Sequence, residues 1–144
     1  EVPFNCFKLK TMLPYKEGLE ESARIKWWGR ILRNTSVDEL PQLLNILLGN
    51  MSFIGPRPLP LAYIGRFPLY ALQRHEIKPG LTGWAQVNGR NQLSWDEKFE
   101  LDIFYINNQS FKLDLIILVK TIQIVVFMKG INRNRKLSMP ELLN

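Results

Sequence analysis

The sequence has very few of the residues that bind soft metal ions or form disulfides. Its 144 residues include one cysteine, Cys6, and one histidine, His75. A single cysteine excludes an internal disulfide and fits a reducing compartment. A zinc site needs several nitrogen and sulfur ligands, so any bound metal ion is expected to be a hard cation on carboxylates, with magnesium the default. His75 has no second histidine or partnered nucleophile motif beside it, and we expect it to be structural.

Long apolar runs are also missing. A membrane-spanning helix needs about 20 consecutive apolar residues. The nearest candidate, residues 113–128, is interrupted by Asp114, Lys120, Thr121 and Gln123, and no signal peptide is visible at the N-terminus. The sequence therefore predicts no spanning helix within these 144 residues.

The composition predicts one folded domain with a basic surface. With 144 residues and 46% hydrophobic content, the chain can bury a core, and we assign residues 1–144 to a single domain. The formal charge of +6 at pH 7 favours an acidic partner such as a nucleotide diphosphate, an anionic lipid surface or nucleic acid. Nucleic acid is disfavoured because the charges are dispersed and no recognition motif is present.

A helix N-terminus carrying two adjacent carboxylates is predicted within residues 34–48. Ser36 and Glu39 form a capping-box pattern, and Gly49 supplies a C-terminal stop. Asp38 and Glu39 would then lie at the positive end of the helix, where carboxylates stay ionised, although simple capping is the more ordinary explanation on spacing alone. Leucines follow at the spacing of one buried helix face: Leu40, Leu43, Leu44, Leu47 and Leu48.

Two further motifs favour phosphate binding. In the first, Gly55-Pro56-Arg57-Pro58, prolines on both sides of Arg57 would present its guanidinium from a rigid loop. An exposed arginine in a proline turn is the alternative. The second, residues 78–91, is punctuated by three glycines that permit tight turns and close ligand approach. Its glycine spacing is not that of a dinucleotide fingerprint.

Together with Phe7-Lys8-Leu9-Lys10-Thr11-Met12, these motifs resemble the bacterial sugar transferase family, the monotopic phosphoglycosyl transferases, over nearly the whole chain. The resemblance implies an enzyme that moves a sugar-1-phosphate from a nucleotide sugar, expected to be a UDP sugar, onto polyprenyl (undecaprenyl) phosphate. This is the first membrane step of bacterial exopolysaccharide, lipopolysaccharide and other glycoconjugate synthesis. The compact length is similar to that of small, bacillosamine-transferase-like members.

The resemblance also implies a location. Family members act at the cytoplasmic face of the bacterial inner membrane and contact its surface. They carry an N-terminal hydrophobic helix that dips into the membrane, and we expect residues 1–144 to begin after that segment. A non-catalytic binding or scaffolding module on a membrane surface, using the same basic and aromatic faces, is the alternative function.

Particular residues acquire roles from the same resemblance. Asp38 matches the family's nucleophile, which forms an aspartyl-phosphosugar intermediate, and Glu39 is expected to hold Mg²⁺. Arg57 with Arg33 would hold the phosphoryl oxygens. The other expected substrate-binding residues are Lys8, Lys10, where the family has arginine, and Gln86 and Arg90, which have no individual role assigned.

The expected fold is a helix-rich α+β domain in which a small irregular sheet packs with amphipathic, membrane-interface helices. The sheet is predicted from residues 3–11 and the regions of Ile54 and Val87. A capping box at Ser94 and Glu97 opens one helix, and residues 110–129 form a long apolar helix that ends at Lys129 and Gly130.

Three features are left with alternatives. Trp27 and Trp28, beside several cations, suit either a membrane interface or the core. Residues 59–76 suit either a broken amphipathic helix on a bilayer or an ordinary packed helix. Asp102 and Tyr105, which resemble the family's Asp-x-x-Tyr, are expected to form a buried hydrogen-bonded pair.

Overall fold

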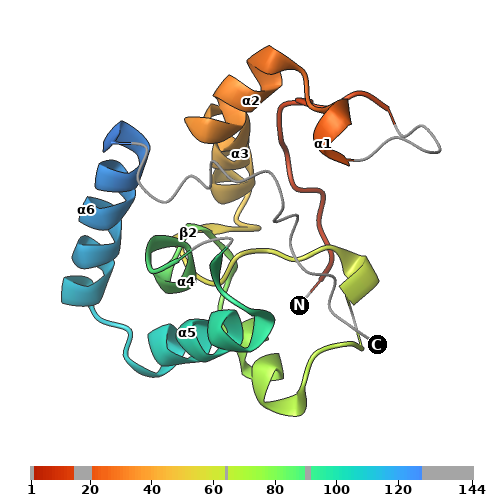
Figure 1. Ribbon diagram of the computed structural model, residues 1–144. Helices are drawn as coiled ribbons and strands as arrows, with labels where there is room; N and C mark the ends of the chain where they lie inside the picture. Colours follow the sequence, from red (N-terminus) through yellow and green to blue (C-terminus); the bar gives the residue numbers. More distant parts are fainter. Residues whose placement is uncertain (1, 15–20, 64, 90–91, 128–144) are drawn as a thin grey trace.

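The computed structural model describes residues 2–14, 21–63, 65–89 and 92–127. Figure 1 shows helices arranged around a very small sheet, so the expected helix-rich α+β class is confirmed. The elements are α1 (Glu21–Arg24), α2 (Trp27–Asn34), η1 (Val37–Glu39), α3 (Gln42–Leu47), β1 (Ser52–Ile54), η2 (Leu61–Tyr63), η3 (Leu69–His75), β2 (Gly80–Thr82), α4 (Trp84–Val87), α5 (Trp95–Asn107) and α6 (Phe111–Phe127).

The sheet has two parallel strands. β1 pairs with β2, and Ser52 lies opposite Gly80. The strand predicted around Ile54 is therefore confirmed, but the other two predicted strands are wrong. Residues 3–11 run extended without joining the sheet, because their backbone groups bond to side chains and to η1 instead. Val87 ends the short helix α4.

A close approach of two backbones fixes where the strands end. A Cβ atom on Gly80 would lie 2.1 Å from the amide nitrogen of Gly55. That amide donates a 2.9 Å hydrogen bond to the Thr82 carbonyl. Only glycine at position 80 leaves room for this close backbone contact, which holds the Gly55–Pro58 loop directly beside β2.

We expect Gly80→Ala to lower the free energy of unfolding by about 3 kcal/mol, because the methyl group would overlap backbone rather than a flexible side chain. Gly65→Ala is the matched control. A Cβ at Gly65 meets nothing, and its φ of +81° should cost only about 1 kcal/mol. Urea unfolding followed by circular dichroism would measure both, and equal losses would contradict the packing account.

The core lies between α5 and η3. Phe99 and Ala71 are fully enclosed there, and Phe67 contacts Phe99 edge-on at a centroid distance of 5.7 Å. Leu59, Tyr63 and Trp95 pack around them. The capping box that opens α5 is confirmed: Ser94 accepts from the Glu97 amide, and Glu97 accepts from the Ser94 amide.

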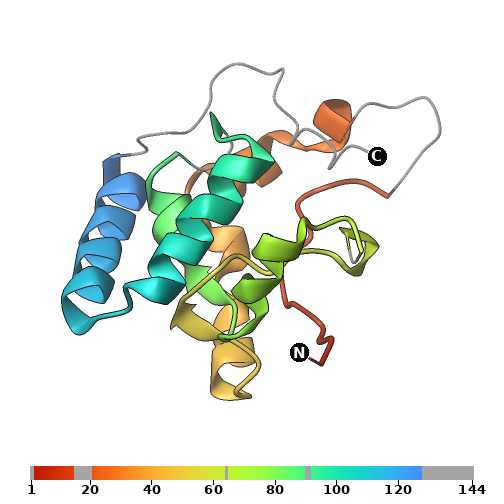
Figure 2. The same ribbon diagram turned by 90° about the horizontal axis from the view of Figure 1, so that it is seen from below.

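The long apolar helix is confirmed over Phe111–Phe127, while its predicted end at Lys129 and Gly130 lies outside the described residues. Figures 1 and 2 both place α6 at one edge of the molecule. It contacts β2 and α4, and the Thr121 hydroxyl lies 2.7 Å from that of Thr82 in β2. Ile117 of the same helix is fully buried. No helix of the described part is both long and apolar enough to span a membrane.

The predicted burial of the leucine face is wrong. All five leucines are exposed, from 38% for Leu43 to 83% for Leu47, and the buried residues of α3 are Gln42 and Asn45. The spacing found the amphipathic face, but the polar side of this helix faces the protein. The predicted start is also wrong, because Ser36 adopts a left-handed conformation (φ 57°) without capping, and a 3-10 turn precedes α3. Gly49, with φ 78°, follows the helix as expected.

The open alternatives are settled in part. Trp27 is 75% exposed and Trp28 37%, so neither ring forms core. The described part of residues 59–76 forms two separate 3-10 helices, η2 and η3, so the helical segment is broken, as the first alternative expected. His75 packs its ring edge-on against Phe67, in line with a structural role.

Asp102 and Tyr105 are both buried, but they do not pair with each other. Asp102 bonds to Arg74, and the Tyr105 hydroxyl donates a 2.8 Å hydrogen bond to Asp114. The expectation of buried, hydrogen-bonded groups that hold the fold is right, and the partner assignment is wrong.

Candidate active site

The N-terminal segment is held across η1 and α3 by hydrogen bonds from its main chain to the Asn45 side chain and to the Asp38 carbonyl. The Phe7 amide donates to Asn45 Oδ1 at 2.9 Å, and Asn45 Nδ2 donates to the Asn5 carbonyl at 2.8 Å. Two residues later, the Leu9 amide donates to the Asp38 carbonyl at 2.9 Å. Lys8 is thereby held between two anchored neighbours, close to the two carboxylates of η1.

Two acids and two cations meet at this point, and we call Lys8, Asp38, Glu39 and Arg57 the carboxylate cluster. Lys8 Nζ lies 3.1 Å from Asp38 Oδ2 and 3.2 Å from Glu39 Oε1. Arg57 reaches Glu39 from the Gly55–Pro58 loop, with Nη1 at 3.3 Å from Oε2 and Nη2 bonded to Oε1. Because one ammonium contacts both carboxylates, the adjacent acids face the same site.

The surrounding charges set the protonation of Glu39. Burial alone would raise its pKa, but Arg57 and Lys8 outweigh burial and lower the pKa of Glu39 to about 2. The same pairing raises the pKa of Arg57, although partial burial of its side chain opposes the shift. Both groups therefore stay charged at neutral pH. The Cys6 thiol lies in this field as well, with a pKa raised chiefly by burial.

Asp38 differs from Glu39 in the burial and the hydrogen bonding of its carboxylate. It is 2% exposed, and its Oδ2 accepts no hydrogen bond although the Lys8 ammonium is nearby. Its described contact is therefore a single ion pair, while the Glu39 carboxylate accepts hydrogen bonds from two cations. The Lys8 side chain is 37% exposed, and it is the contact that a ligand at Asp38 Oδ2 would have to displace.

A second ion pair supports the Arg57 loop from behind. Arg74 Nη2 donates to the Arg57 carbonyl at 2.7 Å and to Asp102 Oδ2 at 3.1 Å, and both side chains of the pair are about 95% buried. Sequence reasoning missed the role of Arg74, because its partners are 17 and 28 residues away. The buried position of Asp102 in the Asp-x-x-Tyr motif was the available signal.

The remaining predicted residues are not brought into contact with the cluster by the hydrogen bonds of the described part. Arg33 donates to Thr11 Oγ1 at 3.0 Å and to Met12 Sδ. Lys10 is exposed on the N-terminal segment. Gln86 lies on α4, where its amide nitrogen and oxygen are buried without a hydrogen-bond partner. Arg90 lies outside the described residues.

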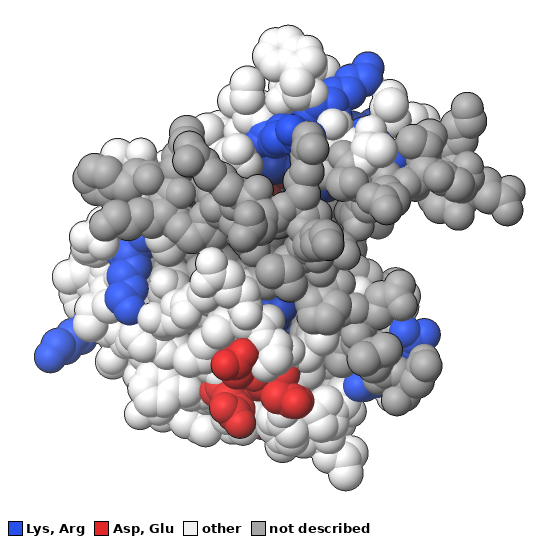
Figure 3. Space-filling view, viewed as in Figure 1, with Lys and Arg blue, Asp and Glu red and all other residues white. Residues whose placement is uncertain are grey.

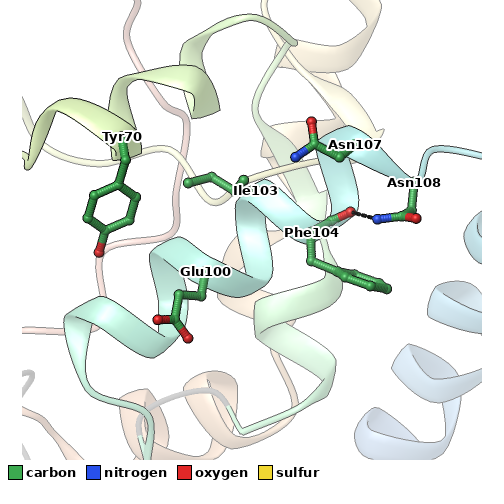
Figure 4. A pocket seen from close by; sticks show the side chains of 6 residues that line it. All are labelled: Tyr70, Glu100, Ile103, Phe104, Asn107 and Asn108. Atoms are coloured by element: carbon green, nitrogen blue, oxygen red, sulfur yellow. Dashed lines mark hydrogen bonds between the residues drawn. The ribbon is translucent and has the colours of Figure 1, made fainter.

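A surface hollow occurs elsewhere, along η3 and the outer side of α5. Figure 4 shows its lining, and none of these side chains is a predicted site residue: Tyr70, Glu100, Ile103, Phe104, Asn107 and Asn108. Figure 3 shows acidic side chains gathered over α5 and basic ones scattered around them. A hollow beside an acidic patch is poorly suited to phosphate, so we place the candidate site at the carboxylate cluster.

The cluster fits one mode of magnesium binding. No group of three or more His, Cys, Asp or Glu residues capable of holding a metal is found among the described residues, which excludes an all-protein cage within them. Magnesium is commonly held by one or two carboxylates together with substrate phosphates. The adjacent carboxylates of Asp38 and Glu39 provide that donor set, with Glu39 as the predicted ligand.

Comparisons with known proteins give a consistent result. The model of the family described as bacterial sugar transferase matches residues 1–128. The chain is 47% identical to an uncharacterized sugar transferase, EpsL, of Bacillus subtilis, over 91% of this chain and 67% of that protein. It is 40% identical to an undecaprenyl-phosphate galactose phosphotransferase of Salmonella typhimurium, over 78% of this chain and 24% of that protein.

A third relative is similar in kind. The chain is 35% identical to a UDP-N-acetylgalactosamine-undecaprenyl-phosphate N-acetylgalactosaminephosphotransferase of Aeromonas hydrophila, over 85% of this chain and 32% of that protein. The chain thus spans from about a quarter to two thirds of the length of these curated relatives. Since the family model covers most of its residues, the chain belongs to the bacterial sugar transferase family.

Proposed function

We propose that this chain transfers a sugar-1-phosphate from a UDP sugar to undecaprenyl phosphate. Relatives named as undecaprenyl-phosphate phosphotransferases support the substrate classes. The observation that carries the proposal is that two adjacent carboxylates, Asp38 and Glu39, face one site but have different ion-pair and hydrogen-bond partners. Glu39 is held ionised by Arg57 and Lys8, while Asp38 keeps a buried oxygen without a hydrogen bond.

The proposed first half-reaction uses Asp38 as the nucleophile. Its Oδ2 attacks the β-phosphorus of the donor, an oxygen–phosphorus bond forms, and the bond from that phosphorus to the bridging oxygen breaks. UMP leaves with the bonding electron pair, and the sugar phosphate remains on Asp38 as an acyl phosphate. Arg57, presented by the proline-flanked loop, would stabilise the phosphoryl oxygens as charge develops on them.

The second half-reaction regenerates the carboxylate. A phosphate oxygen of undecaprenyl phosphate attacks the phosphorus held on Asp38, the acyl–oxygen–phosphorus linkage breaks, and undecaprenyl diphosphate sugar is released. No external proton donor is required, because each leaving group departs as an anion. The cycle is therefore ping-pong, and UMP release should precede binding of the acceptor at the phosphorus.

Glu39 would hold Mg²⁺ in this scheme. When bound, magnesium would neutralise the diphosphate and stabilise the departing nucleotide. Glu39 Oε1 accepts from both Lys8 and Arg57, whereas Oε2 accepts from Arg57 and keeps a second lone pair for the metal. The ionisation of Glu39 at neutral pH also suits a metal ligand.

Glu39→Gln should raise the magnesium concentration needed for half-maximal transfer by about tenfold or more, in the range seen when a metal site loses a supporting group. The assay is UMP release at a series of magnesium concentrations. Glu100→Gln, which neutralises an exposed acid in the hollow on α5, should leave the titration unchanged. An unaltered titration in Glu39→Gln would remove Glu39 from the metal.

A membrane surface is the proposed setting, at the cytoplasmic face of the inner membrane. The exposed leucines of α3 and Trp27 of α2 are large apolar side chains turned outward. Trp27 lies next to exposed Lys26, which precedes α2, and α2 also carries exposed Arg30. This combination suits lipid headgroups and the acyl boundary beneath them. An acceptor with a polyprenyl chain would approach from such a surface.

The direct test of the function is product formation. The chain, supplied with magnesium, a panel of UDP sugars and undecaprenyl phosphate in detergent, should release UMP and form a diphosphate-linked lipid sugar with at least one donor. A membrane-surface scaffold, the rival function, would bind anionic vesicles without releasing UMP. Vesicle binding with no turnover for any donor would therefore favour the rival.

A further inference from the structure

Lys98 is a buried lysine without a polar partner. It lies on α5 with 9% of its surface exposed, and its Nζ is enclosed and makes no hydrogen bond. The ammonium lies 4.7 Å from the centroid of the Trp95 ring. Burial lowers the pKa of Lys98. An enclosed ammonium with three unused donors is costly, so its retention here calls for a ligand.

Lys120 has an environment similar to that of Lys98, but it also has a hydrogen-bond acceptor. Lys120 lies 4.6 Å from the centroid of the Trp84 ring, much as Lys98 lies over Trp95. Lys120 also donates a 2.8 Å hydrogen bond to Asn88 Oδ1. The stacking on tryptophan is therefore common to both lysines, and the absent acceptor is particular to Lys98.

The position of Lys98 connects it to the Arg57 loop. Asp102 follows one helical turn later on the same buried side of α5, where side chains four residues apart are neighbours. Arg74 joins Asp102 to the carbonyl of Arg57 through two hydrogen bonds. On the other side, α4 packs against α5 and carries Gln86, whose amide is also buried and unpartnered.

Charge balance indicates what the ligand is. The carboxylate cluster contains two acids and two cations and is neutral as a unit, and the buried Arg74–Asp102 pair is neutral as well. A nucleotide diphosphate or a lipid phosphate brings negative charge that neither group offsets. The enclosed Lys98 ammonium is a positive charge to which no carboxylate among the described residues is hydrogen-bonded. Lys98 lies one helical turn before Asp102, which Arg74 joins to the Arg57 carbonyl.

We propose that the Lys98 ammonium binds a phosphate oxygen of a substrate, extending the phosphate site from Arg57 along α5. The proposal rests on the proposed function, which supplies two phosphate-bearing substrates, the nucleotide and the polyprenyl phosphate. The Trp95 ring contacts the Lys98 ammonium from one side, and the phosphate takes the place of the missing acceptor. The nucleotide and the polyprenyl phosphate both offer anionic phosphate oxygens, and binding measurements with each of them distinguish the two ligands.

The test compares Lys98→Met with Lys120→Met. Methionine keeps the length and the contact with the tryptophan ring but removes the charge. Affinity is measured by calorimetry with two probes, UMP in solution and undecaprenyl phosphate in detergent micelles, and thermal unfolding is recorded for each variant. Lys98→Met should weaken at least one probe by about tenfold or more, the effect of losing a charge-assisted hydrogen bond, without lowering the melting temperature. Lys120→Met should weaken neither.

Each outcome is decisive. Loss confined to UMP assigns Lys98 to the nucleotide, and loss confined to the lipid assigns it to the acceptor. If wild type binds both probes and Lys98→Met binds them equally well, Lys98 does not contact phosphate, and the proposed function stands. A lower melting temperature with unchanged affinity would show a purely structural cation–π role. If wild type binds neither probe, the proposed function fails and the Lys98 site fails with it.

Discussion

Asp38→Asn should lower the rate of sugar-phosphate transfer by about 10⁴-fold or more, the scale of loss when a catalytic nucleophile is removed. An amide oxygen is a far weaker nucleophile than a carboxylate and forms no stable acyl phosphate. The structure predicts that the fold survives, because the Asp38 side chain makes one ion pair and no hydrogen bond through Oδ2. The hydrogen bond that anchors the N-terminal segment uses the Asp38 backbone carbonyl.

The measurement is UMP release at saturating donor and magnesium. Asp96→Asn, at an exposed acid on α5, is the matched control and should keep full activity. Asp38→Ala guards against restoration of aspartate by deamidation and should be equally inactive. Activity above about one per cent of wild type in Asp38→Ala, far more than loss of the nucleophile allows, would show that another group attacks the donor.

Arg74→Met should destabilise the fold by about 3–5 kcal/mol, the usual cost of leaving one member of a buried ion pair unmatched. Asp102 would remain as an enclosed carboxylate without its guanidinium. The Arg57 carbonyl would also lose its 2.7 Å hydrogen bond. Urea unfolding followed by circular dichroism gives the loss directly, and a change below about 1 kcal/mol, within the range of an exposed pair, would contradict the buried-pair account.

A double variant separates stability from positioning. Arg74→Met with Asp102→Leu removes both charges and should recover most of the lost stability, since buried pairs are often replaceable by apolar side chains. Its transfer rate should stay well below that of wild type, because Arg57 still lacks the donor on its carbonyl. Recovery of stability and full activity together would show that Arg74 does not position Arg57.

The same ion pair predicts a pH dependence of stability. Burial raises the pKa of Asp102 to about 6, although Arg74 opposes the shift. An unfolded aspartate titrates near about 3.9. Because the folded state binds this proton more tightly, the stabilisation is full below about pH 4 and is lost as pH rises through about 6. Asp102 should therefore contribute a fall of up to about 3 kcal/mol in unfolding free energy across that window, and Asp102→Asn should flatten it.

Sequence patterns correctly predicted the helices that are determined by residues close together in the chain. The Ser94–Glu97 capping box and the apolar run of α6 depend on neighbours within one or two turns, and both helices form as expected. The leucine repeat of α3 was also found correctly as an amphipathic face. The prediction that this face is buried was wrong, because periodicity locates an apolar face but does not show what packs against it. In this helix the opposite, polar face is buried, and its Asn45 side chain holds the main chain of residues 5 and 7.

The candidate site required contacts that no local pattern contains. Lys8 was expected near the phosphates from the resemblance, while the strand expected to present it does not form, and backbone bonds to Asn45 and Asp38 place it instead. The capping-box spacing at Ser36 was misleading, since its left-handed backbone and the following 3-10 turn orient the two acids. Arg74 contacts groups far along the chain, which only the folded structure brings together.

Intact-protein mass spectrometry tests the central claim most directly. The chain is incubated with magnesium and each of a panel of UDP sugars, without acceptor, and its mass is recorded before and after undecaprenyl phosphate is added. The account predicts a gain of one sugar phosphate with the cognate donor, its disappearance on addition of acceptor, and no gain in Asp38→Asn. Transfer to undecaprenyl phosphate without any adduct, or an adduct that persists in Asp38→Asn, would contradict it.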